Sequence, residues 1–408
     1  MRDNKKLRIA YLSGPSDAVN VYSEWLERRE QNYFGTSYMK QFFDVCTAVN
    51  ADGYVITTLP GEYSISRRGP FIFENRPVPS ALSGVMYHLA MIKWFARLAP
   101  KLLQFKPNVL IATANQNHWF MLFYVRWFGV YIVPSFHTVL WPKFAPIRRS
   151  WRILWELNRI SFLANAKGAL AASKDISQQL RTLMGENKLE ILEHLPTYPI
   201  SQFISIQLPT AVPRQPFRVF FAGRIETNKG IYVIVEIARR LNVDRHGMFR
   251  FDICGEGEEL DSLRRLVDHL DLKEVVRCHG FLDSQKLSAV LASSHAVIVP
   301  TTTEFEEGFN MVCAEAILAG RPVITSAVCP ALAYVKEAAV EVQPDNVDQY
   351  HQAVLKLAED AEFYKLKHEA CAALQEQFFD PKNSWAEKLK TLLKHASLVD
   401  LRDNAKSQ

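Results

Sequence analysis

Two carboxylates eight residues apart are the part of this sequence best suited to chemistry. Glu307 and Glu315 belong to a segment, residues 303–320, that follows one apolar run at 295–300 and precedes another at 322–325. This order predicts a strand, a loop leading into a helix, and a second strand. The loop would lie at the carboxyl edge of a parallel sheet, where open α/β proteins bind ligands. The start of the helix would offer unpaired backbone amides to a phosphate.

Two interpretations of this pair remain open at this point. A ligand with a phosphate, a sugar on one side and a ribose on the other could contact both side chains, because Glu315 lies about two helical turns beyond Glu307. The structural alternative makes Glu307 a partner of the helix dipole, worth about 0.3 to 1 kcal/mol, and Glu315 a solvated surface charge. Spacing alone does not decide between them.

Two cations follow a second expected strand, at 217–223. Arg224 and Lys229 leave its carboxyl end, on the same side of the sheet as the Glu307 loop. Surface cations near a helix start are disfavoured by the dipole, so a ligand-binding role is the better explanation. With the backbone amides that follow Glu307, the two cations would neutralise a diphosphate. The amides concerned are those of Gly308, Phe309, Asn310 and Met311.

A turn with two glycines, Gly255 and Gly257, follows the next expected strand at the same edge. The third glycine of a dinucleotide-binding fingerprint is missing, so we expect a loop contact to a nucleobase instead. No Asp-x-Asp sequence occurs in the chain, and no His or Cys residues have zinc-site spacing. We therefore expect no metal site and no resident cofactor.

The length of 408 residues exceeds one ordinary core, and strands alternate with helices. We predict an α/β protein made of two Rossmann-like, doubly wound domains that face a cleft. The expected units are residues 1–205, residues 206–380, and an amphipathic closing helix within 381–400 that packs back on the first unit. The expected strands are 7–13, 53–58, 107–112, 130–136, 168–173, 217–223, 249–255, 275–279, 295–300 and 322–325; the expected helices include 38–49, 82–104, 148–165, 258–270 and 284–293.

Charge divides the chain into unlike halves. Residues 1–205 hold 24 Lys and Arg against 14 Asp and Glu, whereas the rest of the chain holds 24 against 29. No acidic residue occurs between Glu74 and Glu156, while the aromatic-rich stretch 76–152 contains ten basic ones. This combination favours an anionic membrane surface, an acidic polymer or a phosphorylated acceptor, with a solvated basic face as the alternative. Nucleic acid is not expected, because no nucleic-acid module signature is present.

The apolar segments and cysteines bear on localisation. No apolar run reaches the roughly 18 to 20 residues needed to span a bilayer, and the six cysteines form no CxxC pair. We expect reduced, buried cysteines and a cytoplasmic protein, with peripheral attachment to the inner face of the cell membrane as a further expectation.

The second half of the chain resembles the retaining glycosyltransferases of family four, the group 1 glycosyltransferases of the GT-B fold. The resemblance rests on five motifs taken together. In that family, residues matching Arg224 and Lys229 bind the donor diphosphate, Glu307 contacts the transferred sugar, Glu315 holds the ribose hydroxyls, and the amides after Glu307 hold phosphate. The motifs are G-R-x4-K at 223–229, G-x-G at 255–257, His279-Gly280-Phe281, the Glu307 and Glu315 pair, and Gly320-Arg321-Pro322-Val323-Ile324.

The first half resembles the family less closely. Its glycine loop is represented by Gly35 after an insertion beyond Gly14, and His137 occupies the family position of a histidine near the reacting sugar. His194 is expected to be structural. The family's Asn-Gly-Val-Asp is replaced by residues 195–198, so acceptor contacts in that region are not carried over.

The resemblance implies a retaining, metal-independent transfer of a sugar from a nucleoside diphosphate sugar to an acceptor hydroxyl. The acceptor would be lipid-linked or a saccharide, in polysaccharide or glycolipid biosynthesis. Three alternatives use the same architecture. They are a sugar-nucleotide epimerase or hydrolase, a glycan phosphorylase that needs pyridoxal phosphate, and a non-catalytic scaffold.

Overall fold

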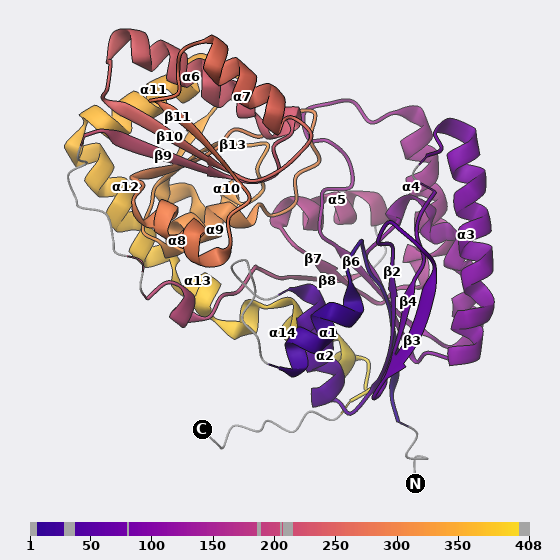
Figure 1. Ribbon diagram of the computed structural model, residues 1–408. Coiled ribbons are helices and arrows are strands. Elements are labelled where there is room, and N and C mark those ends of the chain that lie inside the picture. Colours follow the sequence, from indigo (N-terminus) through magenta and orange to yellow (C-terminus); the bar gives the residue numbers. More distant parts are fainter. Residues whose placement is uncertain are drawn as a thin grey trace.

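The computed structural model describes residues 6–27, 37–79, 81–185, 189–204, 206 and 215–399, and it contains two α/β domains (Figure 1). The sheet of the N-terminal domain has the strand order β3-β4-β2-β1-β5-β6-β7-β8. All neighbouring strands pair in parallel except β3, which is antiparallel to β4. The strands are β1 (Arg8–Leu12), β2 (Asp52–Thr57), β3 (Ser64–Arg68), β4 (Phe71–Asn75), β5 (Val109–Ala112), β6 (Tyr131–Phe136), β7 (Gly168–Ala171) and β8 (Glu190–Glu193).

Helices cover both faces of this sheet, which explains why its central strands are nearly continuous apolar runs. On one face pack α3 (Gly84–Phe105), the 3-10 segment η1 (Gln116–Phe128) and α4 (Arg149–Ser161), around the buried Trp119. On the other face pack α1 (Ala18–Leu26) and α2 (Tyr38–Ala48), around Phe42 and Phe43. Helix α5 (Lys174–Met184) follows β7.

The sheet of the C-terminal domain has the order β11-β10-β9-β12-β13-β14, and all its pairs are parallel. This is the strand order of a dinucleotide-binding fold, whose order reverses between β9 and β12. Ligands bind at that reversal in folds of this type. The strands are β9 (Phe217–Ala222), β10 (Phe249–Cys254), β11 (Val276–Gly280), β12 (Ala296–Val299), β13 (Val323–Ser326) and β14 (Ala339–Val342); the helices are α6 (Ile231–Asp244), α7 (Leu260–His269), α8 (Ser284–Ala292), α9 (Met311–Leu318), α10 (Leu332–Val335), α11 (Val347–Glu359), α12 (Ala361–Leu374) and α13 (Glu376–Phe379).

The last helix, α14 (Trp385–His395), returns to the N-terminal domain and lies beside α2 (Figure 1). Its Trp385 is fully buried and donates a hydrogen bond from Nε1 to Ser135 Oγ at 2.9 Å. The amide of Ala386 donates to Gln41 Oε1 at 3.0 Å. The helix therefore completes the core of a domain from which it is separated by the whole C-terminal domain.

The two domains touch where their functional loops meet. The amide of Val139, in the loop after β6, donates to the carbonyl of Glu307 at 3.3 Å. Lys174 of α5 lies 4.8 Å from the ring centroid of Tyr334, whose hydroxyl contacts Glu193 at 3.3 Å. These contacts fix how the carboxyl edges of the two sheets face each other.

The structure contains several elements that the sequence patterns did not predict. They include α1, the β3–β4 hairpin, β8, β14, α5 and the helices from α10 to α13. In the described ranges, no helix is long and apolar enough to cross a membrane.

Candidate active site

Three loops meet at the strand reversal of the C-terminal domain. They follow β9, β10 and β12, and they carry Arg224 and Lys229, Gly255 and Gly257, and Glu307. Parallel strands place these loops at one sheet edge, as predicted from their positions after strands. The loop after β6 of the N-terminal domain, with His137, faces them across the cleft.

The carboxylate of Glu307 is buried and accepts four hydrogen bonds. Lys229 Nζ lies 2.7 Å from Oε2, which also accepts from Thr301 Oγ1 at 3.1 Å and Asn310 Nδ2 at 3.0 Å. The amide of Gly308 donates to Oε1 at 3.2 Å. Burying a charge is costly unless it is paired and hydrogen-bonded, and here it is both. Glu307 is therefore held in one position, and it is not a solvated partner of the helix dipole.

A glycine brings Lys229 to this carboxylate. Lys229 ends a 3-10 turn, η4 (Thr227–Lys229), which is followed by Gly230 with a φ of +75°. A Cβ at Gly230 would lie 2.0 Å from the carbonyl oxygen of Pro300. Only glycine allows this turn to pack against the end of β12, so backbone geometry sets the Lys229 to Glu307 contact.

Arg224 and Lys229 share an aromatic neighbour. Lys229 Nζ lies 3.8 Å from the ring centroid of Phe305, and the Arg224 guanidinium lies 5.5 Å from it. The Arg224 side chain is 60% exposed and pairs with Glu226 at 2.6 Å. A cation over an aromatic face is attracted by the ring quadrupole, most strongly where water is excluded. Arg224 can therefore turn toward a ligand, whereas Lys229 is already in place.

Helix α9 begins later than the phosphate-binding prediction assumed. Its N-cap is Asn310, with a left-handed φ of +64°, and its first residue is Met311. The amide of Gly308 is occupied by Glu307. The free amides of the first helical turn thus begin at Met311, whose side chain is exposed.

Glu315 is buried inside the protein, so it is not a solvated helix charge. The hydroxyl of Tyr198 lies 3.4 Å from its Oε1, and burial raises the pKa of its carboxyl to about 7. Tyr198 comes from the connection between the domains, where the sequence offered no family motif to identify it. At neutral pH Glu315 is therefore partly protonated and ready to exchange Tyr198 for another hydroxyl donor.

Gly255 and Gly257 are required by close packing. At Gly255, an added Cβ would lie 1.8 Å from the carbonyl oxygen of Gly223. At Gly257, an added Cβ would lie 2.4 Å from the carbonyl oxygen of Ile225. The amide of Gly255 donates to the carbonyl of Gly280 at 2.9 Å. Both glycines hold the Arg224 loop in position, and the Gly255 amide already has a protein partner.

His137 directly follows β6 and lies at the contact between the domains. Its Nε2 lies 3.2 Å from Ser135 Oγ, and its ring centroid is 4.1 Å from that of Tyr38. Burial lowers its pKa to about 4, so the ring is neutral at neutral pH. Within the described part of the chain Nδ1 has no hydrogen-bond partner. Gly35, the predicted glycine-loop residue, falls in 28–36, outside the described residues.

His194 lies beside His137, with ring centroids 5.7 Å apart. It is fully buried, and burial is the main cause that lowers its pKa well below the usual value. Neither ring nitrogen has a hydrogen-bond partner among the residues that the structure describes. A neutral, packed histidine fits the structural role predicted for it.

Comparison with known proteins finds a family model that matches the C-terminal domain. Residues 209–377 match the model of the glycosyl transferases group 1. A putative colanic acid biosynthesis glycosyltransferase, WcaL of Escherichia coli (strain K12), is 29% identical over 121 residues, which are 29% of this chain and 30% of that protein. The alignment therefore spans less than a third of the relative's length.

Solved structures match nearly the whole chain. A sucrose-phosphate synthase from Thermosynechococcus elongatus has a TM-score of 0.70 at 16% identity, covering 96% of this chain and all of that one. Anabaena Alr3699/HepE in complex with UDP has a TM-score of 0.65 at 15% identity, covering 97% and 100%. Residues 209–377 are thus similar to the group 1 glycosyltransferases, and the two domains of the chain have the GT-B fold.

Proposed function

We propose that the protein is a retaining, metal-independent glycosyltransferase that moves a sugar from a nucleoside diphosphate sugar to an acceptor hydroxyl. The observation that carries this proposal is the buried Lys229 and Glu307 pair at the strand reversal, with Arg224 and Glu315 on either side of it. A scaffold would gain nothing from a lysine and a carboxylate desolvated at a ligand-binding edge.

The diphosphate would lie between Arg224, Lys229 and the first turn of α9. As the glycosidic bond breaks, the leaving diphosphate gains negative charge, and preorganised cations stabilise that charge most where water is excluded. Lys229 is already fixed beside Glu307, and Arg224 has the freedom to close over the ligand. We propose that these two side chains balance the diphosphate charge without a metal ion.

The transferred sugar would lie between Glu307 and His137. Because its carboxylate accepts four hydrogen bonds, Glu307 is suited to orient sugar hydroxyls and poorly suited to attack the anomeric carbon. This arrangement favours attack by the acceptor on the face that the diphosphate leaves, with retained configuration. The neutral His137 ring would contact the sugar and the acceptor.

Glu315 would accept the ribose hydroxyls in place of the Tyr198 hydroxyl. The amides from Phe309 to Met311 complete the proposed donor site, while Gly255 and Gly257 hold the Arg224 loop beside it. The UDP held by a neighbour of the same fold illustrates the class of donor nucleotide that this site would take.

The outer face of the N-terminal domain favours a peripheral membrane location, which we propose as well. Segment η1 packs against both α3 and α4. These two helices expose Val85, Leu89, Ile153 and Ile160, within or beside the basic stretch 76–152. Basic side chains near anionic lipid contribute about 1 kcal/mol each. Flotation with phosphatidylglycerol vesicles but not with phosphatidylcholine vesicles is expected; equal flotation with both would contradict the proposal.

We propose that the reaction belongs to polysaccharide or glycolipid biosynthesis, and the colanic acid biosynthesis in the name of the Escherichia coli relative supports the first of these. We propose the cytoplasm or the inner face of the membrane as its location. The acceptor would be a saccharide or a lipid-linked sugar.

A thermal-shift screen of nucleotide sugars, followed by measurement of nucleoside diphosphate release, tests the function. Binding stabilises the protein in proportion to the logarithm of ligand over dissociation constant. Donor turnover that is identical with and without acceptors would identify a hydrolase or epimerase instead. Nuclear magnetic resonance of the product reports the anomeric configuration, and an inverted product would overturn the retaining assignment.

A further inference from the structure

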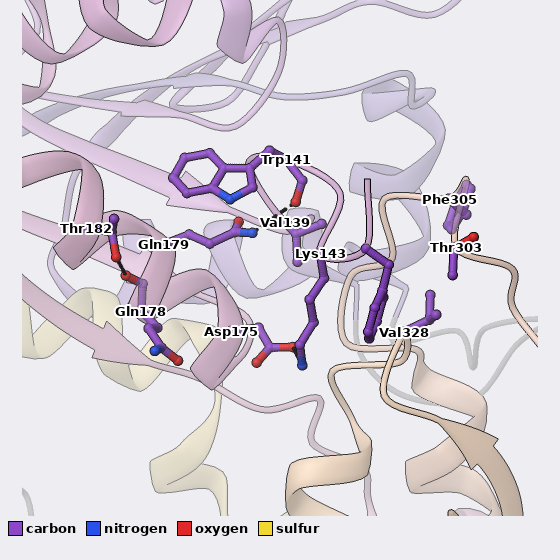
Figure 2. Close-up of a pocket in the computed structure, with 11 residues that line it drawn as sticks. Val139, Trp141, Lys143, Asp175, Gln178, Gln179, Thr182, Thr303, Phe305 and Val328 are labelled. Carbon is purple, nitrogen blue, oxygen red and sulfur yellow. Dashed lines mark hydrogen bonds and ion pairs between the residues drawn. The ribbon is translucent and has the colours of Figure 1, made fainter. Parts of the chain in front are cut away.

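A cavity of about 290 Å³ opens between the two domains, next to the proposed donor site (Figure 2). Trp141, Lys143, Asp175 and Gln178 of the N-terminal domain line one side, and Thr303 and Phe305 of the C-terminal domain line the other. Of these residues, the proposed donor site uses Phe305, whose ring lies next to Arg224 and Lys229. The others have no role assigned above.

Two contacts join this cavity to the donor site. Val139 lines the cavity, and its amide donates to the carbonyl of Glu307 at 3.3 Å. Phe305 lines the cavity as well, and Lys229 Nζ lies 3.8 Å from its ring centroid. A molecule in the cavity would thus contact Val139 and Phe305, which in turn contact Glu307 and Lys229 of the proposed donor site. An acceptor must lie beside the donor sugar, and the cavity meets this requirement.

The aromatic wall of the cavity is held in place from behind. Gln179 Nε2 donates to the carbonyl of Trp141 at 2.9 Å, and its Oε1 accepts from the amide of Leu140 at 2.7 Å. The carbonyl of Leu140 accepts from Trp155 Nε1 at 3.0 Å. Figure 2 shows the Trp141 indole above Gln179, at one end of the cavity. These bonds fix the backbone of Trp141, and its half-buried side chain packs against the core of the N-terminal domain with part of the ring left for contact.

The charges in the cavity cancel. Lys143 and Asp175 are the charged side chains among the described residues that line it, and Lys143 Nζ lies 3.3 Å from Asp175 Oδ2 (Figure 2). A phosphate or carboxylate would find no uncompensated cation here, and it would have to break the existing pair. Hydroxyl groups can instead join the pair, since the lysine donates and the carboxylate accepts.

We propose that this cavity is an acceptor subsite for one uncharged sugar residue. The sugar ring would pack on Trp141, and its hydroxyls would bond with Lys143, Asp175 and Gln178. An aromatic face with amide and ionised partners matches the alternating apolar and hydroxyl faces of a saccharide. The inference rests on the proposed glycosyl transfer and chooses a neutral sugar over a phosphate as the group next to the donor.

Acceptor kinetics provide one test. With the nucleotide sugar that gives the largest thermal shift, nucleoside diphosphate release is measured with methyl glycosides of neutral hexoses, with methyl glucuronide, with hexose phosphates and with a short-chain polyprenyl phosphate. Neutral glycosides should accelerate release most. Trp141→Ala should raise the KM for the glycoside about tenfold while leaving acceptor-free release unchanged, and Trp141→Phe should keep most of the affinity.

The ion pair provides a second test within the same assay. Asp175→Asn leaves Lys143 without its partner, so the KM for methyl glucuronide should fall by a factor of about 3. Leu366→Ala, an exposed apolar residue on α12, serves as the control and should change nothing. Faster use of phosphates than of neutral glycosides by the wild-type protein would overturn the proposal, as would an equal loss of acceptor-free and acceptor-dependent release in Trp141→Ala.

Direct binding separates failure of this inference from failure of the proposed function. Saturation-transfer nuclear magnetic resonance detects binding of the methyl glycosides without any turnover. A neutral glycoside should show transfer with the wild-type chain and lose it with Trp141→Ala. If no nucleotide sugar is turned over, the glycosyltransferase proposal fails, and this measurement still decides about the cavity. Absence of transfer from the wild-type chain, or full transfer from Trp141→Ala, would overturn the subsite.

Discussion

The two sides of the inter-domain cleft are built in different ways. On the C-terminal side, Glu307 and Glu315 are buried, and glycines at contact distance fix the loops that surround them. On the N-terminal side, Trp141 lies in a loop, and Lys143 pairs with Asp175 where both are partly exposed to solvent. Backbone packing at glycines fixes the C-terminal side, whereas the N-terminal side is formed by side chains that other residues could replace.

This contrast explains why one side can be assigned from motifs and the other cannot. At Gly230 and Gly255 an added Cβ would lie within 2.0 Å of a carbonyl oxygen, so no other residue fits there. These glycines therefore constrain the sequence around Arg224 and Lys229. A surface ion pair and a tryptophan on a loop carry no such constraint. Donor chemistry should therefore respond sharply to single substitutions, and acceptor chemistry gradually.

The largest effect is expected from Lys229→Ala. Turnover should fall roughly 100- to 1000-fold, because a preorganised charge at the leaving diphosphate is lost. The free energy of unfolding should also fall, since Glu307 stays buried without its partner. Nucleoside diphosphate release measures the turnover, and urea unfolding measures the free energy of unfolding.

A double variant separates these two losses. Lys229→Ala with Glu307→Gln should recover stability but not turnover. Lys286→Ala, which removes an exposed lysine of the same domain, is the control. Near-normal turnover of Lys229→Ala would remove the reason for treating the C-terminal side as the donor site.

Leu389→Ala should cost about 2 to 5 kcal/mol of unfolding free energy, because the side chain is fully buried. The loss should appear in the N-terminal domain, since α14 packs there. Urea unfolding followed by tryptophan fluorescence measures it, with Lys394→Ala on the exposed face of the same helix as the control. All eight tryptophans lie in the N-terminal domain or in α14, so a tryptophan signal that unfolds at the same urea concentration as in the wild-type protein would contradict this account of α14.

Gly308→Ala tests whether the two sides must touch. A Cβ at this position would lie 2.3 Å from the carbonyl oxygen of His137, so the domains must move apart. We expect about a tenfold loss of turnover, the effect of misplacing the reacting groups, together with a larger radius of gyration in solution X-ray scattering. Gly247→Ala has open space at its Cβ and should keep the normal radius. An unchanged radius and rate for Gly308→Ala would show that the contact is dispensable.

The smallest effect concerns the pH dependence of nucleotide binding. Because the pKa of Glu315 is raised to about 7, its protonated form stabilises the unliganded protein, and that contribution is lost as the pH rises through 7. Ribose hydroxyls favour the carboxylate, so affinity for the nucleotide should increase between pH 6 and pH 8, by less than about tenfold.

Calorimetry in buffers of different ionisation enthalpy should show proton release. Glu315→Gln should abolish the pH dependence, while Glu306→Gln, whose pKa is also raised to about 7, should retain it.

The alternation of strands and helices was enough to predict two Rossmann-like domains and many of their elements, and the family resemblance implied the GT-B fold. Expected strand 249–255 is Phe249–Cys254, and expected helix 284–293 is Ser284–Ala292. The β3–β4 hairpin was missed because β3, Ser-Ile-Ser-Arg-Arg, is an exposed edge strand with little apolar content. Element β14 was missed because Glu341 interrupts its short apolar run.

The candidate site was predictable where each residue follows a strand directly. Arg224, Lys229 and Glu307 meet because parallel strands end at one edge. Thr301 and Tyr198, which bond to Glu307 and Glu315, were not predicted, because a lone threonine and a tyrosine in an inter-domain connection have no pattern of their own. The roles of the glycines in close packing also needed coordinates, since a sequence does not show which carbonyl faces an absent Cβ.

The return of α14 gives the molecule two covalent tethers between its domains. The chain crosses once before β9 and again before α14, and the two crossings run side by side, with Leu195 bonded to Asn383 and Tyr198 to Phe378. A single proteolytic cut in either crossing would leave the domains joined by the other. Any movement of the two domains would therefore be a bending about this double connection, which would keep the two walls of the cleft in register.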